Sequence, residues 1–369
     1  MLASRWVESR FRGPADTTFL ADPADVEKFH ETLPGYAPTP LHALPALARE
    51  LGVGAIWVKD EGQRFGLNAF KGLGASYAIH RYLAAHPPKG KLTFATATDG
   101  NHGRAVAWSA KRLGHDAVIY VPRNTVAARI EAIRGEGARC EVIDGNYDET
   151  VKRAAADAAK HGWQVISDTS WQGYTEIPAW IMSGYATLFR ESITQLAGTV
   201  PTSIFLQAGV GGMAIAGLAV AAPLTPRPKL ICVEPLDADC LAESAATSDG
   251  RIAEAKGKQD SIMAGLNCGT PSLLAWPALR AGLDGFLAVD DGWAADAMRR
   301  LARPQAGDPK IVAGESGAAG LAGLLALCKE PALAGARKAL GLDGSARVLL
   351  INTEGDTDPV NYERIVGAA

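Results

Sequence analysis

The chain of 369 residues lacks several features that define common protein classes. Its five cysteines are scattered without a CxxC spacing, which argues against a zinc site and favours reduced thiols. The longest apolar run, 213–224, is too short to span a bilayer. A formal net charge of -3 provides no basic field for nucleic acid or for an anionic membrane. We therefore expect a globular protein with no nucleic-acid partner, no membrane partner and no metal.

Two further classes, exported proteins and α/β-hydrolases, are also disfavoured by the sequence. Arg5, Glu8, Arg10 and Arg12 lie where a signal peptide needs an apolar core, so we expect a cytoplasmic protein. Gly-Glu-Ser-Gly-Ala at 314–318 is similar to the nucleophile elbow of hydrolases, but no histidine follows His161. Because α/β-hydrolases place the catalytic histidine after the serine, this pattern argues against that class. Whether Cys240 and Cys268, which flank a polar stretch, form a disulfide stays open at this point.

Glycine, in contrast, is abundant, with 40 residues, and the chain alternates β-branched runs with Ala-rich helical patterns. This alternation predicts βαβ units and parallel sheet. The segment 92–167 could form a compact lobe, and 244–262 and 304–317 are expected to be surface loops. The predicted strands are 56–59, 92–96, 117–121, 139–143, 164–167, 203–206, 230–233, 286–289 and 348–351. The predicted helices include 72–85, 103–113, 127–134, 149–161, 213–221, 291–301 and 318–327.

Ligands of open parallel sheets bind at the carboxyl ends of strands, so the strand-to-helix junctions are the candidate sites. The first junction, 66–74, places Lys71 at the start of a helix beside Phe70. An apolar and electropositive setting would lower the pKa of this lysine, which suits Schiff-base chemistry. A lysine that extends to solvent is the simpler interpretation of this segment alone.

The second junction, 96–103, follows a strand and opens a helix, so its hydroxyls and backbone N–H groups could hold a carboxylate. Asp99 would repel such an anion, which indicates a cationic group on the ligand or a proton-transfer role. Asp99 could equally cap the following helix. His102 has no surrounding metal-ligand spacing and is more typical of a structural histidine.

The third junction, 207–213, combines glycines with a helix N-terminus and is typical of a phosphate-binding loop. Gly209, Gly211 and Ala214, with Glu234 after the next strand, also match a dinucleotide fingerprint. An NAD-dependent dehydrogenase is therefore an alternative, although it gives Lys71 and the Asp99 loop no role.

The fourth junction ends the strand 348–351 with Asn352, Thr353 and Glu354, and Thr353 could bond a ring nitrogen. Asp168 lies just past the strand 164–167, so it could point into the same crevice or cap a turn.

These junctions, in their order along the chain, resemble those of fold-type II pyridoxal-phosphate (PLP) enzymes, the tryptophan synthase β-like superfamily. FGLNAFKGLGASYA, TATDGNHGRAVAW, SDTSWQGY, QAGVGGMA and INTEGDTDPVNY are similar, within that group, to diaminopropionate ammonia-lyases. The resemblance covers about residues 30–365. The lysine loop marks only the superfamily, whereas Asp99 and NTEGDTDP are more specific.

The resemblance implies an α/β fold of two open, mostly parallel sheet lobes, with the cofactor pyridoxal 5′-phosphate in the cleft between them. It implies a large PLP-binding domain, 1–88 with 200–369, and a small mobile domain, 89–199. The implied catalytic residues are Lys71, which forms the Schiff base, Asp99 and Asp168. The other implied cofactor contacts are Asn101 at the 3′-oxygen, Gly209, Val210, Gly211, Gly212 and Met213 at the phosphate, and Thr353 at the pyridine nitrogen. The implied substrate contacts are Thr98, Asp99, Gly100, Asn101, His102 and Asp168.

The implied reaction is α,β-elimination of 2,3-diaminopropionate, in its D and L forms, to pyruvate and ammonia by a homodimeric lyase. Two carboxylates suit the cationic β-amine of that substrate. The remaining alternatives are a threonine or serine dehydratase of the same fold, the NAD-dependent dehydrogenase, and a ligand-binding α/β protein without turnover.

Overall fold

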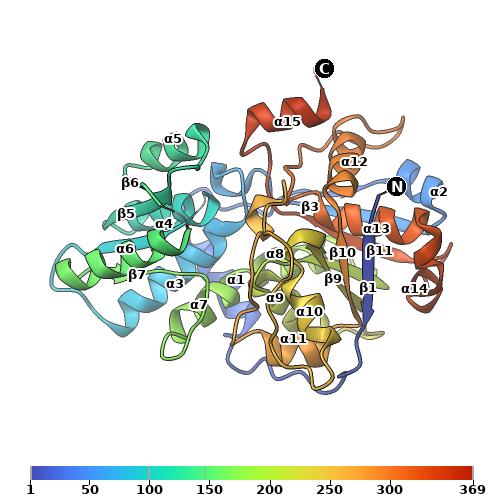
Figure 1. Cartoon of the computed structure of the whole chain (residues 1–369), viewed down its shortest axis with the longest axis horizontal. Helices are drawn as coiled ribbons and strands as arrows, with labels where there is room; N and C mark the ends of the chain where they lie inside the picture. The colour runs from blue at the N-terminus through green and yellow to red at the C-terminus, as the bar shows by residue number, and fades with distance from the viewer. Residues whose placement is uncertain (1, 99, 146, 368–369) are drawn as a thin grey trace.

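The computed structural model describes residues 2–98, 100–145 and 147–367. These residues form two sheets, one of seven strands and one of four, and helices cover both (Figure 1). The smaller sheet and its helices lie at the left of the view and the larger sheet lies at the centre and right. The predicted α/β class with two mostly parallel sheets is confirmed.

The larger sheet has the order β1-β10-β9-β8-β11-β3-β2. Its inner strands are parallel, and β1 and β2 pair antiparallel at the two edges. Its strands are β1 (Ser4–Glu8), β2 (Leu41–Ala43), β3 (Ala55–Asp60), β8 (Ser203–Gln207), β9 (Lys229–Pro235), β10 (Gly285–Val289) and β11 (Arg347–Asn352).

The smaller sheet has the order β6-β5-β4-β7, and all of its strands are parallel. Its strands are β4 (Thr93–Ala97), β5 (Asp116–Pro122), β6 (Arg139–Ile143) and β7 (Gln164–Val165). The loops that follow β4 and β7 therefore leave neighbouring strands at the same edge.

The larger sheet is the middle layer of three. Ile204 and Leu206 belong to the apolar core on one of its faces, whereas Phe205 belongs to the core on the other. This alternation follows from the period of two residues along a strand.

The helices are α1 (Pro23–Glu31), α2 (Pro45–Leu51), α3 (Lys71–Ala85), α4 (Asn101–Arg112), α5 (Ala127–Gly135), α6 (Tyr147–His161), α7 (Glu176–Gly184), α8 (Ala186–Gln195), α9 (Gly212–Ala221), α10 (Cys240–Ala246), α11 (Trp276–Gly282), α12 (Asp291–Ala302), α13 (Ala319–Lys329), α14 (Ala334–Ala339) and α15 (Pro359–Val366).

Helix α3 packs against both α4 and α7. Gly74 allows this close approach: a Cβ there would lie 2.5 Å from Cε1 of Tyr185 and 2.8 Å from the carbonyl oxygen of Ile181. The helix that begins with Lys71 is thus packed closely against its neighbours.

A buried cluster of four charged side chains lies beneath the loop that leads to α3. Lys59 of β3, Glu61, Arg64 and Glu191 of α8 are each at most 3% exposed. The Glu191 carboxylate accepts hydrogen bonds from Lys59 Nζ at 2.6 Å and from Arg64 Nη2 at 2.7 Å. Arg64 Nη2 also donates to Glu61 at 2.7 Å. Two cations thus balance two anions inside the protein, as buried charges require.

The nine predicted strands are all present, with bounds that differ by at most two residues. The two edge strands β1 and β2 were not predicted, and neither were helices such as α7 and α8. The prediction of a loop over 244–262 is wrong at its start, because residues 244–246 complete α10. The stretch 304–317 contains no helix or strand, as predicted.

In the part of the chain that the structure describes, no single helix has the length and apolar composition needed to cross a membrane. One pair, Ala319–Lys329 and Pro331–Ala339, passes that test only when joined across an 87° bend.

Candidate active site

Lys71 is the first residue of α3, and backbone contacts hold the loop before it. The loop donates from the N–H of Phe70 to the carbonyl oxygen of Thr353 at 3.1 Å. The carbonyl oxygen of Asn68 in the same loop accepts a hydrogen bond from the N–H of Gly355 at 3.0 Å. The end of β11 is therefore fixed beside the start of α3, and Lys71 and Thr353 belong to one site.

The Lys71 ammonium pairs with Asp168, and the Nζ–Oδ2 distance is 2.7 Å. The ammonium also lies 5.4 Å and 5.8 Å from the ring centres of Phe70 and Tyr185, which is the range of a cation–π contact. With only 21% of its side chain exposed, Lys71 does not extend into solvent. The structure thus brings together two predicted site residues that are 97 positions apart in the sequence.

The prediction of a lowered pKa for Lys71 is wrong in this structure. Burial opposes its charge, but the carboxylate of Asp168 outweighs burial and raises the pKa of Lys71. Burial likewise opposes the charge of Asp168, and the nearby His102 and Lys71 outweigh it and hold the pKa of Asp168 below its usual range. The sequence could not show this, because the partner charge comes from the other lobe.

The loop after β4 carries Thr98, Gly100 and Asn101 into the site. Thr98 braces the loop, since its hydroxyl oxygen accepts from the N–H of Gly100 at 3.0 Å and from that of Gly103 at 3.2 Å. Gly100 has φ of 154°, a left-handed conformation that favours glycine. Asn101 begins α4, and its amide Nδ2 donates to Glu354 at 2.5 Å. Asp99 lies outside the residues that the structure describes.

His102 is 5% exposed and lies in the first turn of α4, close to the residue that follows β7. Its Nε2 lies 2.9 Å from the carbonyl oxygen of Ile166, so this nitrogen carries the proton. Its Nδ1 lies 3.8 Å from Oδ2 of Asp168, which is too long for a hydrogen bond. This arrangement agrees with the prediction of a structural histidine. The His102 side chain holds the backbone at Ile166, two residues before Asp168.

The glycine-rich loop connects β8 to the N-terminus of α9. Gly211 has φ of 98°, and a Cβ there would lie 2.5 Å from Cδ1 of Leu279, so only glycine fits without strain. The first N–H groups of α9 have no partner within the helix, as at every helix start. This end of α9 is therefore suited to bind a phosphate.

Cys240 and Cys268 both lie against Gly209. The Cys240 thiol donates to the carbonyl oxygen of Gly209 at 3.6 Å, and a Cβ on Gly209 would lie 2.7 Å from Sγ of Cys268. The two cysteines do not form a disulfide in the described structure.

Thr353 is 4% exposed, and its hydroxyl lies at the end of β11. The Gln207 amide Nε2 lies 3.4 Å from Thr353 Oγ1 and 2.8 Å from the carbonyl oxygen of Ile351. Because Nε2 can only donate, the hydroxyl hydrogen of Thr353 remains for another acceptor.

Glu234 contradicts the dinucleotide interpretation. Its side chain is fully buried and caps α10, accepting from the N–H of Leu241 at 2.7 Å and from that of Ala242 at 2.8 Å. Burial outweighs these bonds and raises the pKa of Glu234 to about 8. A carboxyl group used in this way cannot bind a ribose.

The side chains at this site suit pyridoxal 5′-phosphate. Lys71 could supply the amine for its aldehyde, α9 the N–H groups for its phosphate, and Thr353 and Asn101 neutral donors for its ring. The space beside Gly211 leaves no room for a side chain, so the phosphate loop passes close to Leu279 at this point. No group of three or more His, Cys, Asp or Glu side chains in the described ranges could hold a metal ion.

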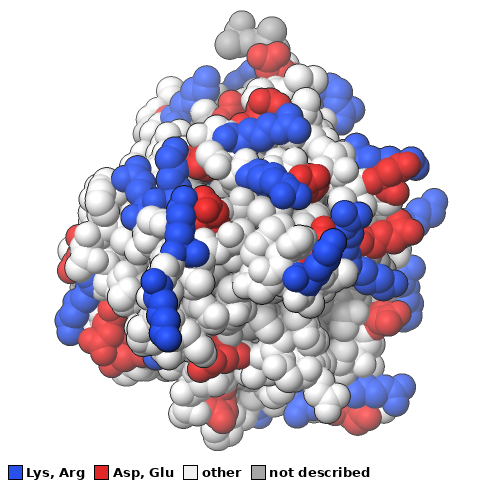
Figure 2. All heavy atoms as spheres, turned by 90° about the vertical axis from the view of Figure 1, so that its left-hand side faces the viewer, with Lys and Arg blue, Asp and Glu red and all other residues white. Residues whose placement is uncertain are grey.

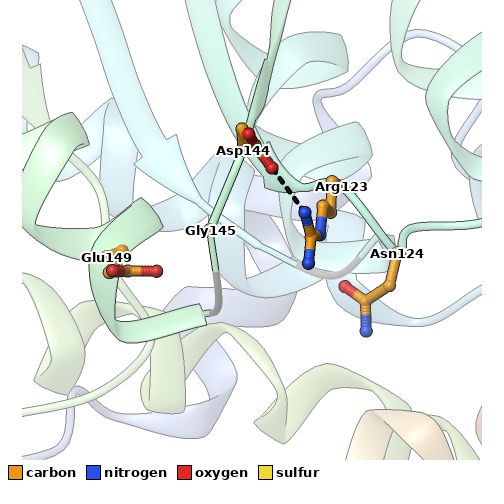
Figure 3. A pocket seen from close by; sticks show the side chains of 5 residues that line it. All are labelled: Arg123, Asn124, Asp144, Gly145 and Glu149. Carbon is orange, nitrogen blue, oxygen red and sulfur yellow. Dashed lines mark hydrogen bonds and ion pairs between the residues drawn. The ribbon is translucent and has the colours of Figure 1, made fainter.

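A separate hollow of about 580 Å³ lies at the carboxyl ends of β5 and β6 (Figure 3). It is lined by Arg123, Asn124, Asp144, Gly145 and Glu149, none of which is a predicted site residue. Arg123 already pairs with Asp144 at 2.7 Å, and both side chains are largely exposed. On the surface seen at the left of Figure 1, basic and acidic side chains lie next to one another (Figure 2).

Gln207 and Glu354 lie in two of the predicted junctions, but no role in the site was predicted for either residue. Both are polar residues at the end of a strand of the larger sheet and at most 2% exposed. A polar residue at the carboxyl end of an apolar strand is the only sequence signal that could have found them.

The fold and the site together are those of a fold-type II PLP enzyme. The family model for pyridoxal-phosphate dependent enzymes matches residues 32–354. Diaminopropionate ammonia-lyase from Escherichia coli strain K12 is 45% identical over 96% of this chain and 94% of its own length. The chain thus belongs to the diaminopropionate ammonia-lyase family of pyridoxal-phosphate dependent enzymes.

Solved structures agree with this assignment. The Escherichia coli diaminopropionate ammonia-lyase in complex with an aminoacrylate-PLP azomethine reaction intermediate has a TM-score of 0.92 and 44% identity, over 100% of this chain and 97% of that chain. The complex of the same protein with D-serine has a TM-score of 0.92 and 43% identity, over 99% of this chain and 97% of that chain. The predicted family, fold type and cofactor are confirmed, and the dehydrogenase interpretation is wrong.

Proposed function

We propose that this chain catalyses the PLP-dependent α,β-elimination of 2,3-diaminopropionate, in both its D and L forms, to pyruvate and two molecules of ammonia. The observation that carries the proposal is the Lys71–Asp168 pair at 2.7 Å, held between the carboxyl ends of two sheets. The names of the relatives support the substrate, and the D-serine complex of one of them supports access for a D-amino acid.

Bound PLP supplies the electron sink that makes the Cα proton of the substrate acidic. Lys71 would hold the cofactor covalently, and the Thr353 hydroxyl would donate to its pyridine nitrogen. A neutral donor at that nitrogen leaves the ring unprotonated, which favours rapid elimination. The phosphate of the cofactor would be bound by the loop of Gly209, Val210, Gly211, Gly212 and Met213 at the start of α9.

The substrate is recognised by charge. Asp168, together with Asp99, binds the β-ammonium of diaminopropionate, for which serine offers only a hydroxyl. Each charge-assisted contact is worth about 1.5–3 kcal/mol, enough for tenfold discrimination or more. The substrate carboxylate would be bound at the start of α4 by Thr98, Gly100, Asn101 and the backbone of His102.

Protons are moved by the same carboxylates and by Lys71. Lys71 and Asp168 are within proton-transfer distance of each other, and we assign both to one face of the substrate. We assign Asp99 as the base for the opposite face, so that either enantiomer finds a base at its Cα proton. Water then hydrolyses the unsaturated amine left by elimination to pyruvate and the second ammonia.

We further infer the organisation of the whole protein. Residues 1–88 and 200–369 form the large domain, and residues 89–199 form a small domain that moves against it. The protein acts as a homodimer in the cytoplasm on a free amino acid. Sedimentation of the purified chain tests the dimer.

Direct tests use the purified protein with PLP. Borohydride should attach the cofactor irreversibly to Lys71 and to no other lysine, as seen by peptide mass analysis. Lys71→Ala should lose the absorbance of the bound cofactor and all turnover. The matched control is Lys91→Ala, since Lys91 pairs at the surface with Asp116 and should be dispensable.

The substrate is tested by pyruvate release from D- and L-diaminopropionate, with serine and threonine assayed in parallel. Faster turnover of the hydroxy amino acids would instead assign the chain to the dehydratases. Turnover of a single enantiomer would refute the proposal of a base on each side.

A further inference from the structure

Glu354 is a buried carboxylate that the proposed reaction leaves without a role. Glu354 follows Thr353 just after the end of β11 and is 2% exposed. Its Oε2 accepts from Nδ2 of Asn101 at 2.5 Å, and its Oε1 accepts from the N–H of Ser316 at 3.1 Å. The bond to Asn101 crosses from the larger sheet to the first turn of α4, which follows the smaller sheet.

This contact fixes the orientation of the Asn101 amide. An amide can present either its oxygen or its nitrogen to a neighbour, but a carboxylate only accepts hydrogen bonds. Glu354 therefore selects the orientation in which Nδ2 points toward it. The Nδ2 group has a second hydrogen, which remains to donate to a ligand.

The segment 314–317 holds Glu354 in place. A Cβ on Gly314 would lie 2.4 Å from the carbonyl oxygen of Gly355 and 3.2 Å from Oε1 of Glu354. A Cβ on Gly317 would lie 2.6 Å from the carbonyl oxygen of Glu354. Both glycines thus allow close contact with Glu354, and Ser316 bonds its carboxylate. These contacts explain the sequence Gly-Glu-Ser-Gly at 314–317. It is similar to a nucleophile elbow, but here it packs around the carboxylate of Glu354.

We propose that Glu354 is a positioning residue: it holds the Asn101 amide so that Nδ2 donates to the 3′-oxygen of the cofactor, and it does so across the two lobes. The inference rests on the proposed role of Asn101 in the PLP-dependent reaction. A charge-assisted bond is roughly twice as strong as a neutral one, so the carboxylate restrains the amide firmly.

The experiment is a double-mutant cycle on PLP binding, with the full-length apoprotein titrated with PLP. Asn101→Ala and Glu354→Ala should each weaken PLP affinity by about tenfold, the loss expected for one oriented hydrogen bond. Once Asn101 is alanine, Glu354→Ala should have little further effect. Each single variant should also shift the absorption maximum of the bound cofactor, and the double variant should match Asn101→Ala.

Two further variants make the test specific. Glu354→Gln keeps an acceptor oxygen and should restore much of the affinity, and it covers the case in which Glu354→Ala does not fold. Glu50→Gln is the control: Glu50 is a carboxyl group that pairs with Arg300 and Lys329, so PLP affinity should not change.

Equal losses from Glu354→Ala in the presence and absence of the Asn101 side chain would overturn the proposal, and so would an unchanged affinity in both Glu354 variants. The readout is independent of the reaction. If wild-type protein binds PLP but does not cleave diaminopropionate, the proposed function fails, and the coupling of Glu354 to Asn101 is still measured.

Discussion

Replacing Glu191 by glutamine should reveal how much the buried charge cluster contributes to stability. Glu191 accepts from Lys59 Nζ at 2.6 Å and from the two terminal nitrogens of Arg64 at 2.9 and 2.7 Å. The backbone N–H of Thr39 donates to the same carboxylate at 3.1 Å. Glutamine has nearly the same shape but carries no charge, so the variant leaves two buried cations beside a single anion, Glu61.

Removing one partner of a buried ion pair costs about 3–5 kcal/mol. We expect the lower end, about 3 kcal/mol, because the glutamine oxygen still accepts some of these bonds. With an unfolding entropy of about 2.1 cal/mol/K per residue, this loss lowers Tm by about 4 °C for a chain of this length. Thermal unfolding of the protein freed of cofactor measures the shift without a contribution from ligand binding.

A double variant provides the sharper test. Lys59→Met in combination with Glu191→Gln leaves Arg64 and Glu61 as a balanced pair, so most of the lost stability should return. Lys28→Ala is the control, because Lys28 and Asp25 form an exposed pair worth less than about 1 kcal/mol. A Glu191→Gln variant as stable as Lys28→Ala, or a double variant less stable than Glu191→Gln alone, would refute the argument.

The same cluster has a predictable pH dependence. Burial opposes the charge of Glu191, but Arg64 and Lys59 outweigh it, so the pKa of Glu191 lies below its usual range. A lowered carboxyl pKa contributes stability above the pKa of the unfolded state, and this stability is lost as pH falls. The difference between wild type and Glu191→Gln should therefore shrink in acid, as measured by Tm against pH.

Other predictions concern the site. Asp99→Asn and Asp168→Asn should each slow one enantiomer of diaminopropionate more than the other, with opposite preferences in the pyruvate assay; equal losses would exclude bases on separate sides. Gly211→Ala should weaken PLP binding at least tenfold because of backbone strain and the close apolar contact, whereas Gly335→Ala, with open space around it, should bind PLP normally. Burial raises the pKa of Glu234 to about 8, so its contribution to stability is lost as pH rises from about 4.5 to 8, by at most ~1.4 kcal/mol per pH unit. Glu234→Gln should remove that slope from urea unfolding measured across the same range.

The central strands and the loops at their carboxyl ends could be predicted from the sequence. Their signals are local: β8 is an apolar run that ends in a glycine-rich loop, and α3 begins directly after the Lys71 loop. Strand β1 lacks such a signal, because its sequence Ser-Arg-Trp-Val-Glu is half polar and gains its structure by pairing with β10. Strand β2 has only three residues and depends on β3 in the same way.

The electrostatics of the site could not be predicted, for a related reason. The pKa of Lys71 is set by Asp168, and the orientation of Asn101 is set by Glu354. Each pair joins segments far apart in the chain, so neither partner shows its environment in the surrounding sequence. Residue types at strand ends indicate a site, but the charge that each group carries depends on which distant strands lie side by side.

The position of β11 has a consequence for how the protein is made. This strand is the last in the chain, yet it lies in the interior of the larger sheet, between β8 and β3. During synthesis, β3 and β8 therefore emerge long before the strand that joins them, and their facing edges stay unpaired until residues 347–352 arrive. The same strand brings Thr353 and Glu354 to the site. A nascent chain can thus complete the cofactor-binding site only after β11 has left the ribosome, and we expect chaperones to protect the unpaired edges of β3 and β8 until then.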